Sequence, residues 1–184
     1  MKIRAYEPKD RDAVRFICLN SEGPCDMDES GCRFILTTYC DYYIEKEAEN
    51  CFVAADDDDR AVGYIICTES YDRFRPVFLS EYVPRIPAEE AAHREGAVNS
   101  TVLQEEYKAQ YPAHLHIDLL PEYQRLGLGS RLVDTLCVHL KEKGVPGVML
   151  TVGSLNTVGQ SFYNKYGFTR LKALPGDVAY GLLL

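Results

Sequence analysis

Apolar residues in the first seventy positions alternate in three short stretches and recur at helical spacing in two others. Alternation predicts strands, and recurrence every three or four residues predicts helices. Pro8 and Asp10 are typical of a helix start, and Val14, Ile17 and Cys18 follow on one face of that helix. The pattern predicts strands at residues 2–6, 51–55 and 61–69, a loop at 20–32, and a second helix over about 29–47.

The last seventy residues predict the order strand, helix, strand, helix, strand, strand. Residues 147–152 are apolar on both faces, as expected at the centre of a sheet. Gly144 and Gly167 are typical of helix ends. With no internal repeat and no linker, residues 1–184 are predicted to form one α/β domain. The helix that begins near Gly129 carries an apolar stripe of Leu132, Val133, Leu136, Cys137 and Leu140.

Residues 71–113 interrupt this order with prolines, tyrosines and a predicted helical stretch over about 88–110. A connection this long in a compact domain is often a lid or a binding loop, although it also fits a surface decoration. We expect the insertion and the 20–32 loop to shape a substrate site. The residues suggesting a polar pocket lined by aromatic side chains are Tyr71, Arg73, Arg75, Tyr107 and Tyr111.

Composition excludes several classes of protein. The net charge of −8 argues against a nucleic-acid surface. No apolar run approaches the ~20 residues that span a bilayer, and the N-terminus lacks a signal-peptide core. We therefore expect a cytoplasmic protein with no nucleic-acid or membrane partner. Seven cysteines without a Cys-x-x-Cys pair predict reduced thiols, and the four acids at 56–59 predict a solvated hairpin turn better than a metal site.

The stretch "LPEYQRLGLGSRLVDTL" (120–136) places two glycines where a strand ends and a helix begins. A helix start offers unpaired N–H groups and a partial positive charge, and so binds phosphate. Gly127 and Gly129 let an anion approach the backbone, while Gln124 and Arg125 add donors. A P-loop would need a lysine before Ser130, and a dinucleotide fingerprint would need glycine at Leu132.

The remaining pattern, Gln-x-x-Gly-x-Gly on "QRLGLG", resembles the GNAT family of N-acetyltransferases, whose Arg/Gln-x-x-Gly-x-Gly/Ala loop cradles the pyrophosphate of coenzyme A. "HLHIDLL" before it and "FYNKYGF" after it strengthen the resemblance, which is clear over about residues 114–170. "YPAHLHIDLLP" and "GVPGVMLTVGSLNTVGQSFYNKYGF" also resemble bacterial acetyltransferases related to the acetyltransferase-like domain of O-GlcNAcase.

The resemblance implies a GNAT fold: a mixed, mostly antiparallel sheet of about six or seven strands with a splayed central pair, flanked by about four helices plus the helical insertion. It implies acetyl-CoA as co-substrate and no metal. Pantetheine would pair with free backbone groups of Leu119 and Leu120, and Asn156 would both cap its helix and bond the cofactor arm. The loop implied to hold the pyrophosphate comprises Gln124, Arg125, Leu126, Gly127, Leu128, Gly129 and Ser130.

The resemblance also places Tyr163 as the general acid that protonates the leaving thiolate. His114, His116 and Asp118 share one face of a predicted strand, so His116 or Asp118 is a candidate base. A pKa near 7 favours His116, while Asp118 is nearer the thioester in the motif. The expected reaction is direct acetyl transfer in a ternary complex to a primary amine on a small molecule or a peptide.

Two rival hypotheses come from other classes. The His-x-His-x-Asp stripe of His114, His116 and Asp118 is compatible with a zinc hydrolase, which would leave "QRLGLG" and Tyr163 without a role. A catalytically inactive module of the same fold would bind acetyl-CoA or a peptide without turnover. Metal analysis tests the first and acetyl-CoA turnover tests the second; the protein is expected to be a monomer or a homodimer.

Overall fold

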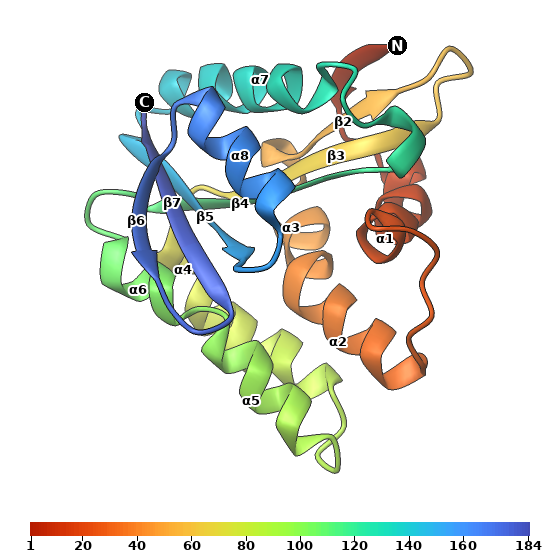
Figure 1. Cartoon of the computed structure of the whole chain (residues 1–184). Helices are drawn as coiled ribbons and strands as arrows, with labels where there is room; N and C mark the ends of the chain where they lie inside the picture. Colours follow the sequence, from red (N-terminus) through yellow and green to blue (C-terminus); the bar gives the residue numbers. More distant parts are fainter.

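The computed structural model describes residues 1–184, and its seven strands form one mixed sheet (Figure 1). The spatial order is β1-β2-β3-β4-β5-β7-β6, and every neighbouring pair is antiparallel except β4 with β5. The predicted α/β class with a mostly antiparallel sheet is confirmed. The strands are β1 (Lys2–Ala5), β2 (Phe52–Ala55), β3 (Ala61–Thr68), β4 (Ala113–Leu119), β5 (Gly147–Gly153), β6 (Thr169–Ala173) and β7 (Asp177–Leu183).

The parallel pair at the centre of the sheet is joined at one end only. β4 meets β5 at Ala113 with Val148 and at His114 with Met149, and the pairing stops there. Beyond this point β4 continues along β3 and β5 continues along β7. The sheet therefore opens between β4 and β5, which confirms the predicted splayed pair.

Helices cover both faces of the sheet and create two main cores. Alternation along the fully buried β3 sends Ile65 and Cys67 into the core beneath α7 and α8, and Tyr64 and Ile66 into the core beneath α1 to α4. Figure 1 shows α7 and α2 on opposite sides of the sheet. The helices are α1 (Arg11–Asn20), α2 (Glu29–Tyr39), α3 (Asp41–Lys46), α4 (Tyr71–Val77), α5 (Ala91–Asn99), α6 (Val102–Tyr107), α7 (Leu128–Glu142) and α8 (Thr157–Tyr166).

None of the helices is both long and apolar enough to cross a membrane. Short 3₁₀ and π-helical turns complete the secondary structure. The 3₁₀ turns are η1 (Pro8–Asp10), η2 (Ala48–Asn50), η4 (Val83–Arg85) and η5 (Pro121–Tyr123), and η3 (Phe78–Tyr82) is a π-helical turn.

The single helix predicted over 29–47 is wrong, because the chain leaves helical geometry at Cys40 (φ −132°, ψ −63°). Four successive residues of α3, from Asp41 to Ile44, are buried. One straight amphipathic helix exposes part of every four residues, so the break lets α3 turn into the core.

The insertion also differs from expectation. The predicted helix over 88–110 is divided into α5 and α6, and two of the tyrosines that suggested an aromatic pocket are packed in the core. Tyr71 and Tyr111 are buried core residues, and the Tyr71 hydroxyl donates to the carbonyl oxygen of Thr101 over 3.0 Å. Arg73 pairs with Glu69. Tyr71 and Tyr111 thus pack the insertion against the rest of the domain, while Tyr107 is only partly buried.

Candidate active site

The loop between β4 and α7 places the first turn of α7 next to the gap between β4 and β5. Gly127 has φ +79°, a left-handed conformation that favours glycine, and it is the residue before α7. A Cβ at Gly129 would lie 3.4 Å from the Phe162 ring, an ordinary van der Waals contact, so the packing of α8 does not itself require glycine here. Leu128 is buried and anchors the first turn. The first N–H groups of α7 lack partners within the helix, as at every helix start.

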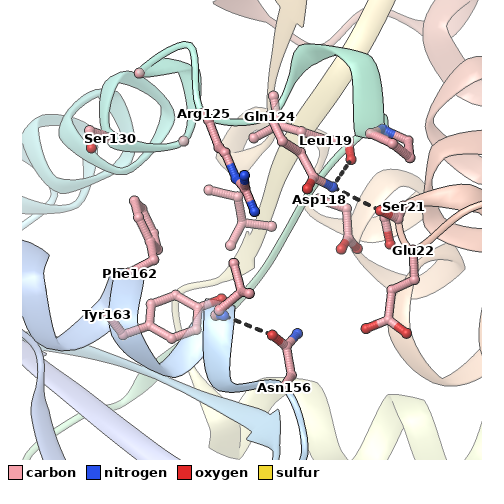
Figure 2. Close-up of a pocket in the computed structure, with 16 residues that line it drawn as sticks. Ser21, Glu22, Asp118, Leu119, Gln124, Arg125, Ser130, Asn156, Phe162 and Tyr163 are labelled. Atoms are coloured by element: carbon pink, nitrogen blue, oxygen red, sulfur yellow. Dashed lines mark hydrogen bonds between the residues drawn. The ribbon is translucent and has the colours of Figure 1, made fainter.

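A cavity of about 570 Å³ lies beside this helix start, at the place where β4 and β5 separate (Figure 2). Its walls come from four segments: the end of α1, the last residues of β4, the glycine loop and the first two turns of α8. Figure 2 shows Arg125 and Tyr163 pointing into it from opposite sides, with Asp118 and Glu22 at a third side. Segments far apart in sequence therefore meet around one hollow.

The backbone of β4 presents a free N–H group at Leu119 but no free group at Leu120. The Leu120 N–H donates to the Val62 carbonyl over 3.0 Å, and its carbonyl accepts from the Tyr123 N–H over 2.9 Å. The expectation that Leu120 offers unpaired groups is therefore wrong. Successive N–H groups point to opposite sides of a strand, so the Leu119 N–H faces the opening toward β5.

Within the glycine loop the polar side chains divide into engaged and available groups. The Gln124 amide donates to the carbonyl oxygens of Ser21 (2.8 Å) and Leu119 (3.0 Å), so its donors are not free for phosphate. Arg125 forms no ion pair within the chain and points into the cavity, where Ser130 also lies. Leu126 is 55% exposed and lies outside the cavity lining.

Tyr163 stands on α8 at the inner wall of the cavity. The residue is 8% exposed, and its ring packs edge-on against Phe162 and Phe168. Burial, and secondly the charge of Asp118, raises the pKa of the Tyr163 phenol well above its ordinary value of 10. The hydroxyl is protonated at neutral pH and has a proton to give, although the raised pKa makes it a weaker acid than an ordinary tyrosine.

Asp118 lines the cavity from the end of β4. Burial raises the pKa of its carboxyl from 3.8 to about 6, although hydrogen bonding from Tyr64 and Ser21 opposes this. The Tyr64 hydroxyl donates to Asp118 Oδ2 over 2.5 Å and fixes the carboxylate. At pH 7 this group is ionised but is a stronger proton acceptor than an ordinary aspartate.

His116 is placed less favourably for the base that its ordinary pKa suggested. Its side chain does not line the cavity, and its Nε2 lies 3.0 Å from the Tyr43 hydroxyl, which is also 2.9 Å from His114 Nε2. Burial lowers the pKa of His116 to about 4. Position and basicity therefore both favour Asp118 over His116.

The same contacts argue against the zinc hydrolase. The Nε2 atoms of His114 and His116 are both turned to the Tyr43 hydroxyl, and Asp118 is held by Tyr64. Nowhere in the chain do three or more His, Cys, Asp or Glu side chains come together in a way that suits a metal ion. The proposed set of His114, His116 and Asp118 as zinc ligands is therefore wrong.

Asn156 caps α8, as its sequence position predicted. Its side chain accepts the Gly159 N–H over 2.7 Å, and it also lines the cavity (Figure 2). The structure adds Ser21, Glu22 and Phe162 to the cavity wall, with Tyr64 behind it. Ser21 and Glu22 belong to the loop expected to border the substrate, whereas the position of Tyr64 opposite Asp118 depends on strand register.

The opened sheet, the glycine-bearing helix start and the cavity between them define a class of protein, the acetyltransferases that bind a coenzyme A thioester between two parted strands. The chain belongs to the acetyltransferase (GNAT) family, whose profile matches residues 19–168. The match confirms the predicted class, an acetyltransferase with acetyl-CoA as its acyl donor. The narrower resemblance to the relatives of the O-GlcNAcase domain stays a prediction.

Individual relatives agree with this class. The crystal structure of SsHAT is 30% identical, with a TM-score of 0.86 over 99% of this chain and 97% of that one. The PaiA N-acetyltransferase of Thermoplasma acidophilum in complex with coenzyme A has a TM-score of 0.62 at 18% identity, covering 100% and 98% of the two chains, and so shares the fold. A mycothiol acetyltransferase of Arthrobacter sp. is 38% identical over 65 residues, 35% of this chain and 19% of that protein. The chain thus matches about a fifth of the length of that relative.

Proposed function

We propose that the protein transfers the acetyl group of acetyl-CoA directly to a primary amine while both substrates are bound. The observation that carries this proposal is the cavity itself. A helix start with free N–H groups, an unpaired strand edge, a raised-pKa carboxylate and a protonated phenol all face one hollow. These groups meet the three needs of the reaction: an anchored cofactor, a proton acceptor and a proton donor.

The glycine loop holds the diphosphate of the cofactor in this proposal. The N–H groups around Gly127, Leu128, Gly129 and Ser130 point out of the α7 start, and the permanent charge of Arg125 adds to the partial charge of the helix. Leu128 contributes through its backbone only, because its side chain is buried in the core. Gln124 and Leu126 help through the shape of the loop.

The sheet opening holds the pantetheine arm. The Leu119 N–H, directed toward β5, is positioned to donate to the arm or to the thioester carbonyl, which would stabilise negative charge on that oxygen. Asn156 lies on the opposite wall with its amide nitrogen available, since its oxygen caps α8. A strand-like ligand would therefore fit between these two walls, in the gap between β4 and β5.

Asp118 and Tyr163 then divide the proton transfers. An acceptor that arrives as an ammonium ion first loses one proton to solvent. Asp118 then accepts a second proton from the neutral amine, directly or through water, as the nitrogen forms a bond to the thioester carbon. The carbon–sulfur bond breaks, and Tyr163 donates its proton to the departing thiolate. Solvent returns a proton to Tyr163 and removes the one on Asp118. The raised pKa of Asp118 suits the first step and the protonated state of Tyr163 suits the second.

The acceptor is an amine on a small molecule or a peptide. Glu22 and Asp118 line the cavity without an ionic partner in the chain, so they favour an acceptor that arrives as an ammonium ion. The insertion contributes indirectly: α5 packs on α2, where His93 stacks on Phe34 with ring centroids 4.9 Å apart. It thereby supports the helix that follows the Ser21–Glu22 loop.

An acceptor screen that follows thiol release from acetyl-CoA tests the function. We expect release to depend on an added amine and to fall by about 100-fold in Asp118→Asn. Calorimetry with coenzyme A should show binding to both proteins. Binding without amine-dependent release from any acceptor would contradict catalysis and support the alternative of a cofactor-binding module. Monomer and homodimer both stay open, and light scattering distinguishes them.

A further inference from the structure

The side chain of Gln124 joins the two substrate-binding walls of the cavity. Its amide nitrogen donates at 2.8 Å to the carbonyl oxygen of Ser21, which lies 103 residues away in sequence, and at 3.0 Å to that of Leu119 (Figure 2). One NH₂ group therefore connects the glycine loop, the end of β4 and the loop after α1. Both hydrogens of the amide are used by these two bonds.

The segment that Gln124 holds has few other ties. The N–H groups of Gly23 and Cys25 both bond to Asn20, and Cys32 approaches Cys25 and the Met27 carbonyl, so these contacts remain within the loop and its flanks. A loop whose own hydrogen bonds are local is free to move as a unit. The bond from Gln124, together with the contact of the Ser21 hydroxyl to Asp118, thus fixes its near end against the site.

That near end carries the groups that face the acceptor. Ser21 and Glu22 line the cavity next to Asp118. The Ser21 hydroxyl is close enough to lower the pKa of the Asp118 carboxyl, and the Glu22 charge raises it, although burial has the larger effect. A displacement of Ser21 and Glu22 would therefore change both the acceptor wall and the environment of Asp118.

We propose that Gln124 is a positioning residue that ties the acceptor wall at Ser21 and Glu22 to the cofactor loop. The inference rests on the proposed function, in which the glycine loop holds the diphosphate and Asp118 is the base. In this role the Gln124 side chain serves the acceptor half of the reaction. When the cofactor is bound to the glycine loop, Gln124 also holds the acceptor wall in place.

Two variants separate this role from diphosphate binding. Gln124→Met removes both donors while keeping the length of the side chain, and Gln124→Arg restores donors that reach the two carbonyls. We expect Gln124→Met to raise the KM for the amine by about fivefold, the effect of losing about one ordinary hydrogen bond. The dissociation constant for coenzyme A should stay within about twofold, and Gln124→Arg should return the amine KM toward the wild-type value.

The pH dependence of kcat/KM is a second measurement, and it would not change if Gln124 only supported the fold. Displacement of Ser21 and Glu22 should move the acidic limb of kcat/KM in Gln124→Met, because the Ser21 contact lowers the pKa of Asp118 and the Glu22 charge raises it. A large rise in the coenzyme A dissociation constant with an unchanged amine KM would overturn the proposal in favour of direct diphosphate binding. Unchanged constants and an unchanged profile would also overturn it.

Hydrogen exchange tests the same link without turnover. The amides of residues 21–28 should exchange faster in Gln124→Met than in the wild type, while those of α7 should not change. Equal exchange would contradict the tie between the loops. Because this measurement needs no acceptor, it stays decisive if no amine is acetylated, and so failure of the proposed function is distinguishable from failure of this inference.

Discussion

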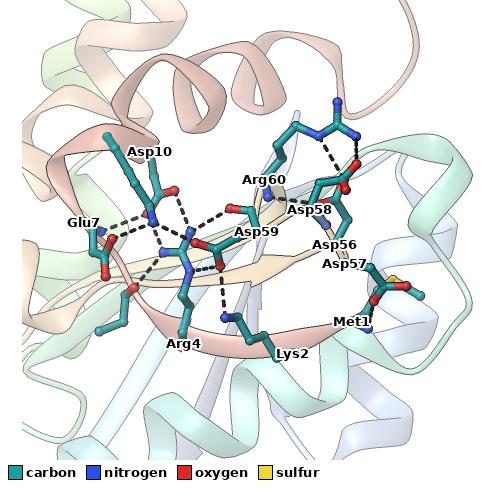
Figure 3. Close-up of polar contacts among 12 residues, drawn as sticks. Met1, Lys2, Arg4, Glu7, Asp10, Asp56, Asp57, Asp58, Asp59 and Arg60 are labelled. Atoms are coloured by element: carbon teal, nitrogen blue, oxygen red, sulfur yellow. Dashed lines mark hydrogen bonds and ion pairs between the residues drawn. The ribbon is translucent and has the colours of Figure 1, made fainter.

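Two regions of the molecule gather charged side chains, and they differ in how those charges are paired. At the turn between β2 and β3, Arg4 donates to Asp10 over 2.6 and 2.8 Å and to Asp59 over 2.9 Å, while Lys9 reaches Asp59 over 2.7 Å (Figure 3). In the cavity, Arg125, Glu22 and Asp118 have no ionic partner in the chain. The first region has the denser charge, and the second has the charge left available for a ligand.

In this molecule, charged groups without a partner, and not the number of charged residues, indicate the ligand site. The four acids at 56–59 form the predicted hairpin turn, with Asp59 at φ +63° and its pKa lowered first by Lys9 and then by Arg4 and Lys2. Only part of that turn is solvated as expected, since Asp59 joins the network with β1 while Asp57 stays exposed. Paired charges of this kind stabilise the structure and leave little to bind a substrate.

The largest effect should come from Gly127→Glu in the glycine loop. A non-glycine residue at φ +79° costs about 1 kcal/mol or more, and the new carboxylate would occupy the place of the diphosphate. We expect the affinity for coenzyme A, measured by calorimetry, to fall by at least about 100-fold.

Gly144→Glu is the matched control, because Gly144 also has a left-handed φ (+73°), also has open space at its Cβ, and lies at the other end of α7. It should lower the melting temperature and leave the affinity for coenzyme A unchanged. Equal loss of binding in the two variants would mean that backbone strain, and not an anion site at Gly127, explains the result.

Tyr163→Phe should have the next largest effect. It removes the proton donor but keeps the ring that packs against Phe162 and Phe168. We expect kcat to fall by about 100-fold, with the coenzyme A dissociation constant unchanged. Tyr166→Phe, on the same helix but bonded to Asp134 outside the cavity, should keep its turnover. Normal turnover in Tyr163→Phe would remove Tyr163 from the mechanism.

A smaller effect on kcat/KM is expected when the pH is lowered enough to protonate Asp118. Burial raises the pKa of this carboxyl to about 6, so protonation below pH 6 should remove the base and reduce kcat/KM. The same shift acts on stability: the folded protein holds this proton up to about pH 6 while the unfolded chain releases it near 3.8, so the unfolding free energy should fall as pH rises between the two values.

Asp118→Asn checks both halves of this prediction. Its residual kcat/KM should lack the limb near pH 6, and its melting temperature should lose the part of the pH dependence that lies between 3.8 and 6. A limb near pH 6 that persists unchanged in Asp118→Asn would assign it to a group other than Asp118.

The parts of this site that depend on local requirements of the backbone could be predicted from the sequence. The parts that depend on contacts between distant segments could not. The left-handed residue before α7 and the cap of α8 follow from Gly127 and Asn156, because each acts within a few residues of itself. His116 and Asp118 share a strand face, but which of them reaches the cavity depends on where β4 parts from β5. The Gln124 contact to Ser21 spans 103 residues and has no local signal.

Aromatic residues show the same limit for the fold. Tyr71, Phe74, Phe78 and Tyr82 recur at helical spacing, and all four are at most 2% exposed. Spacing alone does not tell a buried aromatic stripe from one that lines a pocket, since both need one face of a helix. The choice depends on the surrounding helices, which the residues themselves do not specify.

The smallest effect on catalysis, and the sharpest test of the comparison, should come from Arg4→Met. Asp10 is only 3% exposed, so loss of its bidentate partner leaves a buried charge unpaired and should lower the unfolding free energy by about 3 kcal/mol. Arg60→Met, which removes an arginine that is 72% exposed, should cost no more than about 1 kcal/mol. Denaturant unfolding measures both.

Neither variant should change kcat at a temperature where it is folded, because the network at the β2–β3 turn shares no residue with the cavity wall. A folded Arg4→Met protein that had lost acetyl transfer would show that paired charges at this turn also serve the site, and the distinction between the two regions would fail.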